Sequence, residues 1–287
     1  MLERLSRPFA RLSNGTAKVM DGFFGVLGRP GKLLQDFLNG SWLGHSLHPV
    51  VVDVVVGGST VAVLLQVLSW LGVADLRTAL VWVVGLTWLA GISAIVTGLT
   101  DFKDTATGNE RNVVGLHGLV NIVTTLILVV AFFLLLGGAD VVAGWLVVVS
   151  FGLLSIGAFI GGHVVFKYGY MVNHNAFARG KTAKEFTAVL PVSELPDATP
   201  TKASLGATML VLVRRGDLVF ALKDACSHAG GPLSEGKLAG DTIVCPWHAS
   251  AFRLRDGAVR HGPASTRQVA YRARVSGEQV EVQGPIE

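Results

Sequence analysis

The sequence predicts a membrane α-helical bundle of four transmembrane helices followed by a C-terminal all-β domain. Of the 287 residues, 51% are hydrophobic and only 15% are charged, whereas soluble domains carry about 25% charged residues. Four long segments in the first two thirds of the chain are almost free of charge. After residue 186 the hydrophobic pattern changes from a helical period to that of short strands.

The first 44 residues form a basic, partly amphipathic arm. Four hydrophobic residues recur there at helical spacing, with arginines between them: Leu2, Leu5, Phe9 and Leu12. This pattern is typical of a helix lying on the inner leaflet, although a frayed basic tail would carry it as well. The Gly-Arg-Pro-Gly run at 28–31 interrupts the pattern, and a second short amphipathic stretch surrounds residues 33–38.

Each of the four charge-poor segments is long enough to cross a bilayer, which takes about 20 apolar residues. A buried core helix explains one such segment but not four in succession. None is a signal peptide, because the first begins after more than forty mixed residues. The predicted spans, within a transmembrane domain at 45–167, are Pro49–Val73, Thr78–Thr100, Asn112–Gly138 and Val141–Phe166.

Lysine and arginine lie mostly on one side of this predicted bundle, and only Arg77 lies on the other. The positive-inside rule therefore predicts a multi-pass membrane protein with both termini in the cytoplasm, which in a bacterium means the inner membrane. No Arg-Arg pair precedes the first span, so nothing indicates twin-arginine export. The basic residues are Arg4, Arg7, Arg11, Lys18, Arg29 and Lys32 in the arm, Lys103 and Arg111 after the second span, and Lys167, Arg179, Lys181 and Lys184 after the fourth.

Polar residues collect near the span ends on this same side. Ionisable groups at membrane depth are costly and usually functional. They are candidates for ligating a b-type haem, for a mononuclear or dinuclear metal site, or for lining a quinone pocket. Buried hydrogen bonds that fix helix packing would explain the same residues without a cofactor. The residues are His45, His48, His117, His163, Asp53 and Asp101.

Residues 168–185 are expected to form an interfacial linker, since Tyr168 and Tyr170 suit the aromatic belt of a membrane surface. His174 is interpreted as a solvated loop residue. Residues 186–287 alternate short strands with glycine turns, as in a small β-sandwich or barrel-like domain. The expected strands are Phe186–Val192, Met209–Val213, Leu218–Leu222, Thr242–Val244, Ala251–Leu254, Gln268–Val275 and Val280–Val282.

The only two cysteines belong to two Cys/His pairs, Cys226-Ser-His228 and Cys245-Pro-Trp-His248, sixteen residues apart. A Rieske [2Fe–2S] site uses two thiolates on one iron and two imidazoles on the other. A structural zinc site has the same four ligand types, but zinc fingers pair Cys with Cys and His with His locally. A disulfide would leave both histidines unexplained. The pattern favours the iron–sulfur site.

The residues around these pairs resemble the Rieske ferredoxin family over about residues 185–287. Both cluster loops are present, as is a third, proline-containing loop at 262–264. The family has glycine after the second histidine, where this chain has Ala249. That difference matters only if the residue needs a positive φ angle.

Departures from the cytochrome bc type imply a lower-potential, ferredoxin-like cluster. That type has two more cysteines, which form a disulfide between the cluster loops, and here those positions are Gly231 and Trp247. It also has a tyrosine hydroxyl near a cluster sulfur, where this chain has Phe252. Ser250 keeps a candidate hydroxyl donor. Hydrogen bonds to the sulfurs raise the reduction potential, so fewer of them lower it.

The membrane half resembles a bacterial family of four-helix membrane domains of unknown function that are sometimes fused to Rieske modules. The resemblance covers about residues 40–170 and brings no established chemistry. It rests on Gly44-His45-Ser-Leu-His48-Pro49 followed by Asp53, then on Thr97-Gly-Leu-Thr-Asp101, His117 and His163.

The combination predicts a membrane-anchored electron-transfer protein, a carrier or oxidoreductase subunit rather than a stand-alone enzyme. A cytoplasmic reductase or other donor would reduce the cluster, and an acceptor at the inner leaflet would receive the electron. The candidate acceptors are a haem, metal or quinone in the bundle, or a partner membrane enzyme. His228 and His248, the exposed edge in the Rieske family, are the expected electron port.

The alternative function is a redox or oxygen sensor that the helices merely tether in the lipid bilayer. The chain has no glycine-rich dinucleotide fingerprint, so NADH chemistry would come from a partner. The net charge of +4 is explained by the basic membrane flanks, without a nucleic-acid partner.

Overall fold

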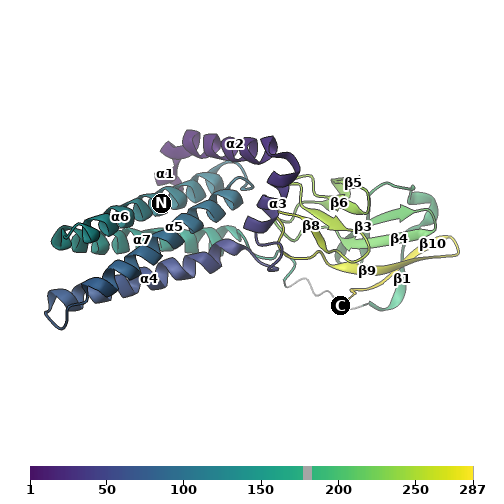
Figure 1. Ribbon diagram of the computed structural model, residues 1–287. Coiled ribbons are helices and arrows are strands. Elements are labelled where there is room, and N and C mark those ends of the chain that lie inside the picture. The colour runs from purple at the N-terminus through teal and green to yellow at the C-terminus, as the bar shows by residue number, and fades with distance from the viewer. Residues whose placement is uncertain (177–182, 287) are drawn as a thin grey trace. The chain divides into compact units, whose positions relative to one another are not determined.

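The computed structural model describes residues 1–176 and 183–286, which form two compact units. The helical unit consists of Met1–Gly31 and Ser46–Gly169, and the β unit consists of Lys32–His45 and Tyr170–Glu287 (Figure 1). The basic residues Arg179 and Lys181, which contribute to the predicted orientation, lie outside the described residues.

Four long helices make up most of the helical unit, and each is long and apolar enough to cross a membrane. Their boundaries lie within a few residues of the predicted spans, so the prediction of four membrane helices is confirmed. Helices adjacent in the chain pack against each other, and the first also packs against the last, which closes a bundle. They are α4 (Leu47–Trp70), α5 (Arg77–Phe102), α6 (Asn109–Leu136) and α7 (Asp140–Tyr168).

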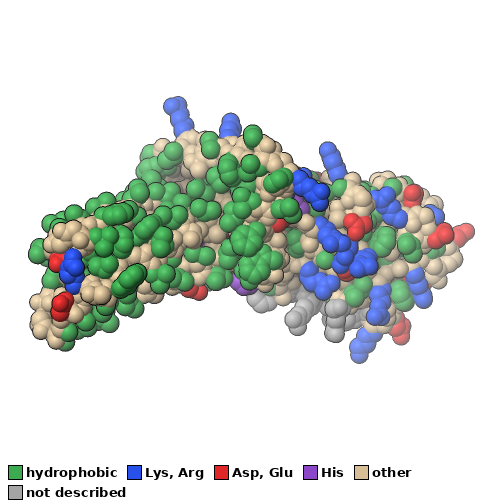
Figure 2. All heavy atoms as spheres, viewed as in Figure 1, with side chains coloured by type: hydrophobic (Ala, Val, Ile, Leu, Met, Phe, Trp, Pro, Cys, Tyr) green, Lys and Arg blue, Asp and Glu red, His purple; other side chains and the backbone are tan. Residues whose placement is uncertain are grey.

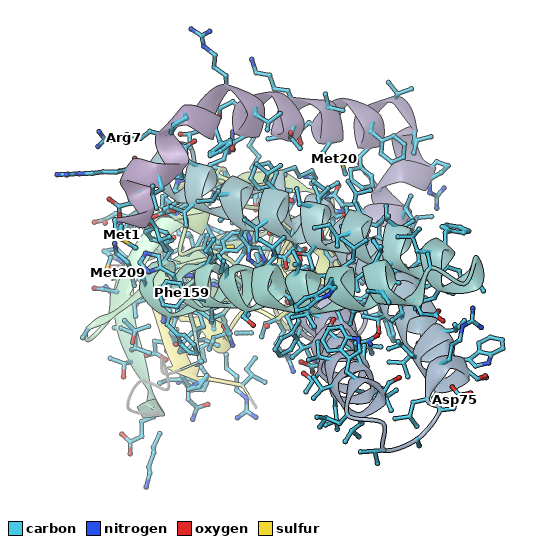
Figure 3. All side chains as sticks on the ribbon, turned by 90° about the vertical axis from the view of Figure 1, so that its left-hand side faces the viewer. Met1, Arg7, Met20, Asp75, Phe159 and Met209 are labelled. Atoms are coloured by element: carbon cyan, nitrogen blue, oxygen red, sulfur yellow. The ribbon has the colours of Figure 1, made fainter. Side chains whose placement is uncertain are left out.

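Small and aliphatic residues fill the bundle interior, while large hydrophobic side chains cover its outside (Figure 2). Phe159 of α7, for example, points away from the neighbouring helices (Figure 3). At the end of the bundle near Asp75, Arg77 bonds Asp140 at 3.0 Å, which joins the starts of α5 and α7. This distribution suits a bundle surrounded by lipid, where the outer surface needs no polar cover.

The N-terminal arm is helical as far as Val26, as α1 (Leu2–Ser6), a 3-10 turn η1 (Arg7–Phe9) and α2 (Ala10–Val26). It packs on α6, and basic residues of the bundle hold it. Lys167 bonds Glu3 at 2.9 Å, and Lys103 lies 3.5 Å from Asp21. Helix α3 (Gly28–Leu38) starts at Gly28, so the predicted break before the second amphipathic stretch lies at the start of the 28–31 run and not across it. The break falls just before it, where Gly28 has a φ of 59°.

The β unit contains two antiparallel sheets, which confirms the all-β prediction. One has the strand order β1-β10-β9-β4-β3-β2 and the other the order β5-β6-β7-β8. The strands are β1 (Ala183–Pro191), β2 (Thr201–Leu205), β3 (Thr208–Arg215), β4 (Leu218–Lys223), β5 (Lys237–Ala239), β6 (Thr242–Val244), β7 (Ala251–Arg253), β8 (Val259–His261), β9 (Ala270–Ser276) and β10 (Gln279–Gly284).

Three of these strands, β2, β5 and β8, are absent from the sequence prediction. Two of them are only three residues long, and β2 is mostly polar, so none has a clear hydrophobic alternation. The smaller sheet positions the candidate site. Phe252, Ile243 and Leu233 are fully buried in the same core cluster as Cys226 and Cys245.

Candidate metal centre

Two closed turns present the two cysteines. Cys226 follows β4, and its backbone N–H donates to Gly231 O at 2.9 Å while its carbonyl accepts from Gly230 N. Cys245 follows β6 in the same way, donating to Ser250 O at 2.8 Å and accepting from Ala249 N. These bonds fix the backbone at both ends of each loop. Each thiol therefore projects from a loop whose backbone is fixed at both ends.

The two thiols lie side by side beneath the loops. Cys226 is 1% exposed and Cys245 is 3% exposed, and neither forms a disulfide. A hydrogen bond with Cys226, followed by backbone N–H groups of Trp247 and His248, lowers the pKa of Cys245 to about 7. The same contact with Cys245, reinforced by burial, raises the pKa of Cys226. The contact between the two buried thiols therefore favours one thiolate next to one thiol.

The two imidazoles also meet. The rings of His228 and His248 lie with their centroids 5.1 Å apart and their planes at 89°. Across the described residues, no three His, Cys, Asp or Glu side chains close around one point as a single metal ion requires. A [2Fe–2S] cluster needs only two protein ligands at each iron. The donor set of two adjacent thiols and two adjacent imidazoles fits such a cluster better than it fits one tetrahedral zinc ion.

Gly231 occupies a position where a side chain would not fit. A Cβ atom there would lie 2.9 Å from the Trp247 ring and 3.0 Å from Cys245 Sγ. The structure thus brings together the two positions that carry the disulfide in the cytochrome bc type. Trp247 fills the space over the first loop instead.

Ala249 does adopt the left-handed conformation, with a φ of 59°. The backbone conformation therefore explains the glycine that the Rieske family has at this position, because a Cβ atom in the left-handed region costs about 1 kcal/mol. The turn itself is retained, since Ala249 N still donates to Cys245 O.

Ser250 is fully buried, and its hydroxyl oxygen accepts the Ala264 N–H of the third loop at 2.9 Å. Its own proton remains to be donated, and a bond to a cluster sulfur stays a prediction. Phe252 is fully buried in the core and contributes no hydroxyl.

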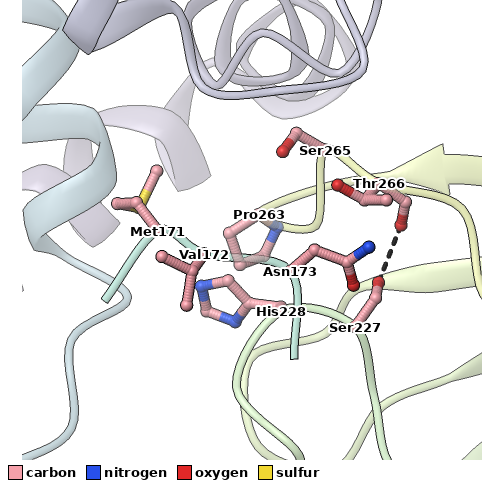
Figure 4. Close-up of a pocket in the computed structure, with 8 residues that line it drawn as sticks. All are labelled: Met171, Val172, Asn173, Ser227, His228, Pro263, Ser265 and Thr266. Atoms are coloured by element: carbon pink, nitrogen blue, oxygen red, sulfur yellow. Dashed lines mark hydrogen bonds between the residues drawn. The ribbon is translucent and has the colours of Figure 1, made fainter. Parts of the chain in front are cut away.

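A segment that sequence reasoning did not connect with the site covers His228. This segment, Met171–Asn175, is called the cap. With His228, Ser227 and the third loop, Met171, Val172 and Asn173 line a small pocket (Figure 4). His228 is only 8% exposed, whereas Trp247 is 58% exposed. The expectation that both histidines form an exposed edge is therefore wrong for His228.

Asn175 and Gln268 fasten the cap to the first cluster loop. Asn175 Nδ2 donates to Ala225 O at 3.1 Å and to Gln268 Oε1 at 2.8 Å. Gln268 Oε1 also accepts the Ser227 N–H at 3.0 Å, and His174 N donates to Ser227 O at 3.1 Å. The His174 side chain itself is exposed, as the sequence suggests. Both fastening residues are buried amides, a feature that no local sequence pattern marks.

Asp36, in the Lys32–His45 part of the β unit, forms hydrogen bonds with the third loop and with the residue before it. Its Oδ1 atom accepts from His261 Nδ1 and from Gly262 N, each at 2.8 Å. Thr266 Oγ1 reaches Gly44 O at 3.3 Å. The amphipathic stretch around 33–38 thus supports the loop next to the candidate metal centre, which its sequence pattern alone did not indicate.

Of the membrane residues singled out by sequence, the structure brings His48 and His117 together. Their ring centroids are 6.5 Å apart. His163 lies instead against the Tyr168 ring, with centroids 5.5 Å apart. Asp101 accepts from Ser46 Oγ at 2.9 Å, Asp53 is exposed, and His45 belongs to the β unit.

Comparison with known families matches both halves of the chain. The Rieske [2Fe-2S] domain family matches residues 185–273. A family described as a predicted membrane protein (DUF2231) matches residues 44–174. Together with the four apolar helices, the second match indicates a multi-pass membrane protein.

Similar proteins share the C-terminal part. Ferredoxin CarAc of Metapseudomonas resinovorans is 36% identical over 80 residues, which are 28% of this chain and 75% of that protein. The anthranilate 1,2-dioxygenase ferredoxin subunit of Burkholderia cepacia is 31% identical over 101 residues, or 35% and 94% of the two chains. Among solved structures, the ferredoxin of carbazole 1,9a-dioxygenase from Nocardioides aromaticivorans IC177 is 30% identical, with a TM-score of 0.33, covering 34% of this chain and 97% of that one.

Proposed function

Because the chain belongs to the Rieske [2Fe–2S] ferredoxin family through its C-terminal domain, we propose that it is a membrane-anchored electron carrier. The observation that carries this proposal is the pairing of two buried thiols with two adjacent imidazoles on a domain joined covalently to four membrane-spanning helices. The relatives are named as a ferredoxin and as a ferredoxin subunit of a dioxygenase, which supports an electron-transfer role.

Cys226 and Cys245 would hold one iron of the cluster, and His228 and His248 the other. When bound, such a cluster takes up or releases a single electron. The protein's own residues fix the ligands and exclude water from the sulfur side, where both thiols are buried. Gly231, Trp247 and Phe252 stand where a high-potential site has a disulfide and a tyrosine, which supports a low potential.

The electron source we propose is a cytoplasmic reductase or another soluble donor. The acceptor we propose lies at the inner leaflet, as a haem, metal or quinone held by the bundle or as a partner membrane oxidoreductase. The cytoplasmic side follows from the one-sided distribution of lysine and arginine. A sensor tethered by the helices is the competing function, and it requires no onward transfer.

The experiment uses membrane vesicles from cells that produce the full chain. NADH and the soluble cell fraction are added without oxygen, and the electron paramagnetic resonance (EPR) signal of the reduced cluster is followed. An electron carrier becomes reduced and is then reoxidised within seconds when a membrane-soluble quinone is supplied, still without oxygen. Vesicles carrying Cys245→Ser show no such signal and serve as the control.

A cluster that is reduced but not reoxidised by any membrane acceptor would contradict the carrier function and support the sensor. A cluster that the soluble fraction cannot reduce, although dithionite does, would contradict the proposed donor.

A further inference from the structure

We propose that His48 and His117 are the two axial ligands of a haem inside the helical unit. His48 lies in α4 and His117 lies in α6, and the residues they contact belong to the same unit. The site therefore stands on the helical unit alone. Its use as the electron acceptor of the cluster rests on the proposed function.

Hydrogen bonds fix the same tautomer in both imidazoles. His48 Nδ1 lies 3.0 Å from Ala94 O of α5, and His117 Nδ1 lies 2.9 Å from Gly157 O of α7. A carbonyl oxygen only accepts, so these shortest contacts place the proton on Nδ1 in each ring. Asn121 Nδ2, also a donor, lies farther from His117 Nδ1, at 3.3 Å, and donates to the His117 carbonyl at 2.8 Å. The Nε2 atom of each neutral ring then has a free lone pair. Histidines that bind metals usually donate the N–H of the other ring nitrogen to a carbonyl or carboxylate in the same way.

The two Nε2 atoms remain available. No described residue forms a hydrogen bond with Nε2 of either ring, since the bonds of both imidazoles are made through Nδ1. Two imidazoles bound to one iron through nitrogen bonds of about 2.0 Å place their ring centroids about 6 to 6.5 Å apart. The observed distance is 6.5 Å. The angle of 83° between the ring planes is also compatible with binding to one iron, because each ring can turn about its own iron–nitrogen bond.

Glycines on the facing helices make room for the rings. A Cβ atom at Gly98 of α5 would lie 2.9 Å from His48 Cε1, and one at Gly161 of α7 would lie 2.9 Å from His117 Cε1. Each imidazole therefore lies directly against the backbone of its neighbour helix. Any larger residue at either position would displace the ring that carries the lone pair.

The ligand count favours haem over a bare metal ion. Protein sites for single ions usually supply three or four ligands, and no third His, Cys, Asp or Glu side chain joins this pair within the described residues. An iron porphyrin brings four nitrogens of its own and needs at most two axial ligands. Its flat apolar ring also suits the interior of an apolar bundle.

As an acceptor, the iron between His48 and His117 would change from ferric to ferrous by taking one electron from the reduced cluster, which returns to its oxidised form. No bond is made or broken in this step, and no proton is required.

The test is haem content and the optical spectrum of the full chain, produced in cells supplied with the haem precursor 5-aminolevulinate and purified in detergent. We expect about one haem per chain with a six-coordinate, low-spin spectrum. His48→Gly and His117→Gly should each lose that spectrum, and imidazole added to the buffer should restore it by filling the space left. His163→Gly, the same change in α7, is the matched control and should keep the spectrum.

The inference is overturned if the wild-type protein contains no haem and binds no added haemin. It is also overturned if both glycine variants keep the wild-type spectrum, or if a bare metal ion occupies the pair. The EPR signal of the cluster is recorded on every sample. An intact cluster signal in a haem-free protein would reject this site without rejecting the proposed electron carrier.

Discussion

Ala249 is the residue at which the second cluster loop is under most backbone strain, because it has a φ of 59° without being glycine. Ala249→Gly is expected to stabilise the β unit by about 0.5 to 1 kcal/mol, since the relief of strain exceeds the added freedom of the unfolded chain. The measurement is the midpoint temperature at which heating abolishes the visible absorption of the cluster, which should rise by roughly 2 to 8 °C.

The matched control is Ala229→Gly in the first loop, where φ is not positive. There the same substitution only adds freedom to the unfolded chain, so the midpoint should fall or stay unchanged. Equal effects at the two positions would contradict the argument from backbone conformation.

Ser250 is the candidate donor to a cluster sulfur, since its oxygen already accepts from Ala264 N and its proton remains. Ser250→Ala should lower the midpoint potential by about 20 to 60 mV, which corresponds to one hydrogen bond of about 0.5 to 1.5 kcal/mol. Phe252→Tyr, which adds a hydroxyl, should shift the potential upward. A redox titration of both variants measures these shifts in midpoint potential. An unchanged potential in Ser250→Ala would show that the hydroxyl does not donate to a cluster sulfur.

At the scale of elements, the cap sets His228 apart from His248. His228 is buried behind Met171 and Val172, and Asn175 anchors that segment through Gln268. Within the β unit, a cluster held by these residues would therefore be more accessible through His248 and Trp247 than through His228. Residues 171–175 are joined to the end of α7 by only two residues, so the covered histidine contacts the part of the chain that continues directly into a membrane helix.

The cap predicts different chemical reactivity of the histidines. Treatment with diethylpyrocarbonate followed by peptide mass spectrometry should modify the exposed His174 readily and His228 slowly. Asn175→Ala and Val172→Ala should each raise the modification of His228 several-fold. Asn109→Ala, at the exposed start of α6, is the control and should change nothing. If His228 reacts as fast as His174 in the wild-type protein, the cap does not protect it.

At the scale of the whole molecule, sequence reasoning succeeded where one pattern dictates one structure. Runs of about 25 apolar residues can only be membrane helices, and all four were located. The two Cys/His pairs marked two loops on which the structure places the two thiols next to each other and the two imidazoles next to each other. Their role as cluster ligands stays a prediction. Glycine turns located most hairpins, including the one at Gly216.

What sequence could not supply depends on contacts between distant residues. The anchoring amide Gln268 lies 93 positions from Asn175, and Asp36 lies 225 positions from His261. Neither pair has a local signature. Among the six polar residues noted near the membrane ends, His48 and His117 approach each other, because the packing of α4 to α7 selects which faces meet. Helical periodicity gives the faces but not their partners.

The predicted orientation can be tested on intact cells. Ala74→Cys places a thiol in the connection between α4 and α5, and Thr107→Cys places one between α5 and α6; both positions are exposed. With cytoplasmic termini, a membrane-impermeant maleimide should label the first variant from outside and the second only after lysis. The reverse pattern would place the Rieske domain outside the cytoplasm.

This membrane-bound chain is proposed to carry a low-potential Rieske cluster on Cys226, His228, Cys245 and His248. An EPR-monitored redox titration of the purified full chain tests it most directly. We expect a one-electron Rieske signal with a midpoint near the low end of the Rieske range, at about −150 mV. A protein that stays EPR-silent on reduction and contains zinc, or a midpoint above about +200 mV, would contradict this account.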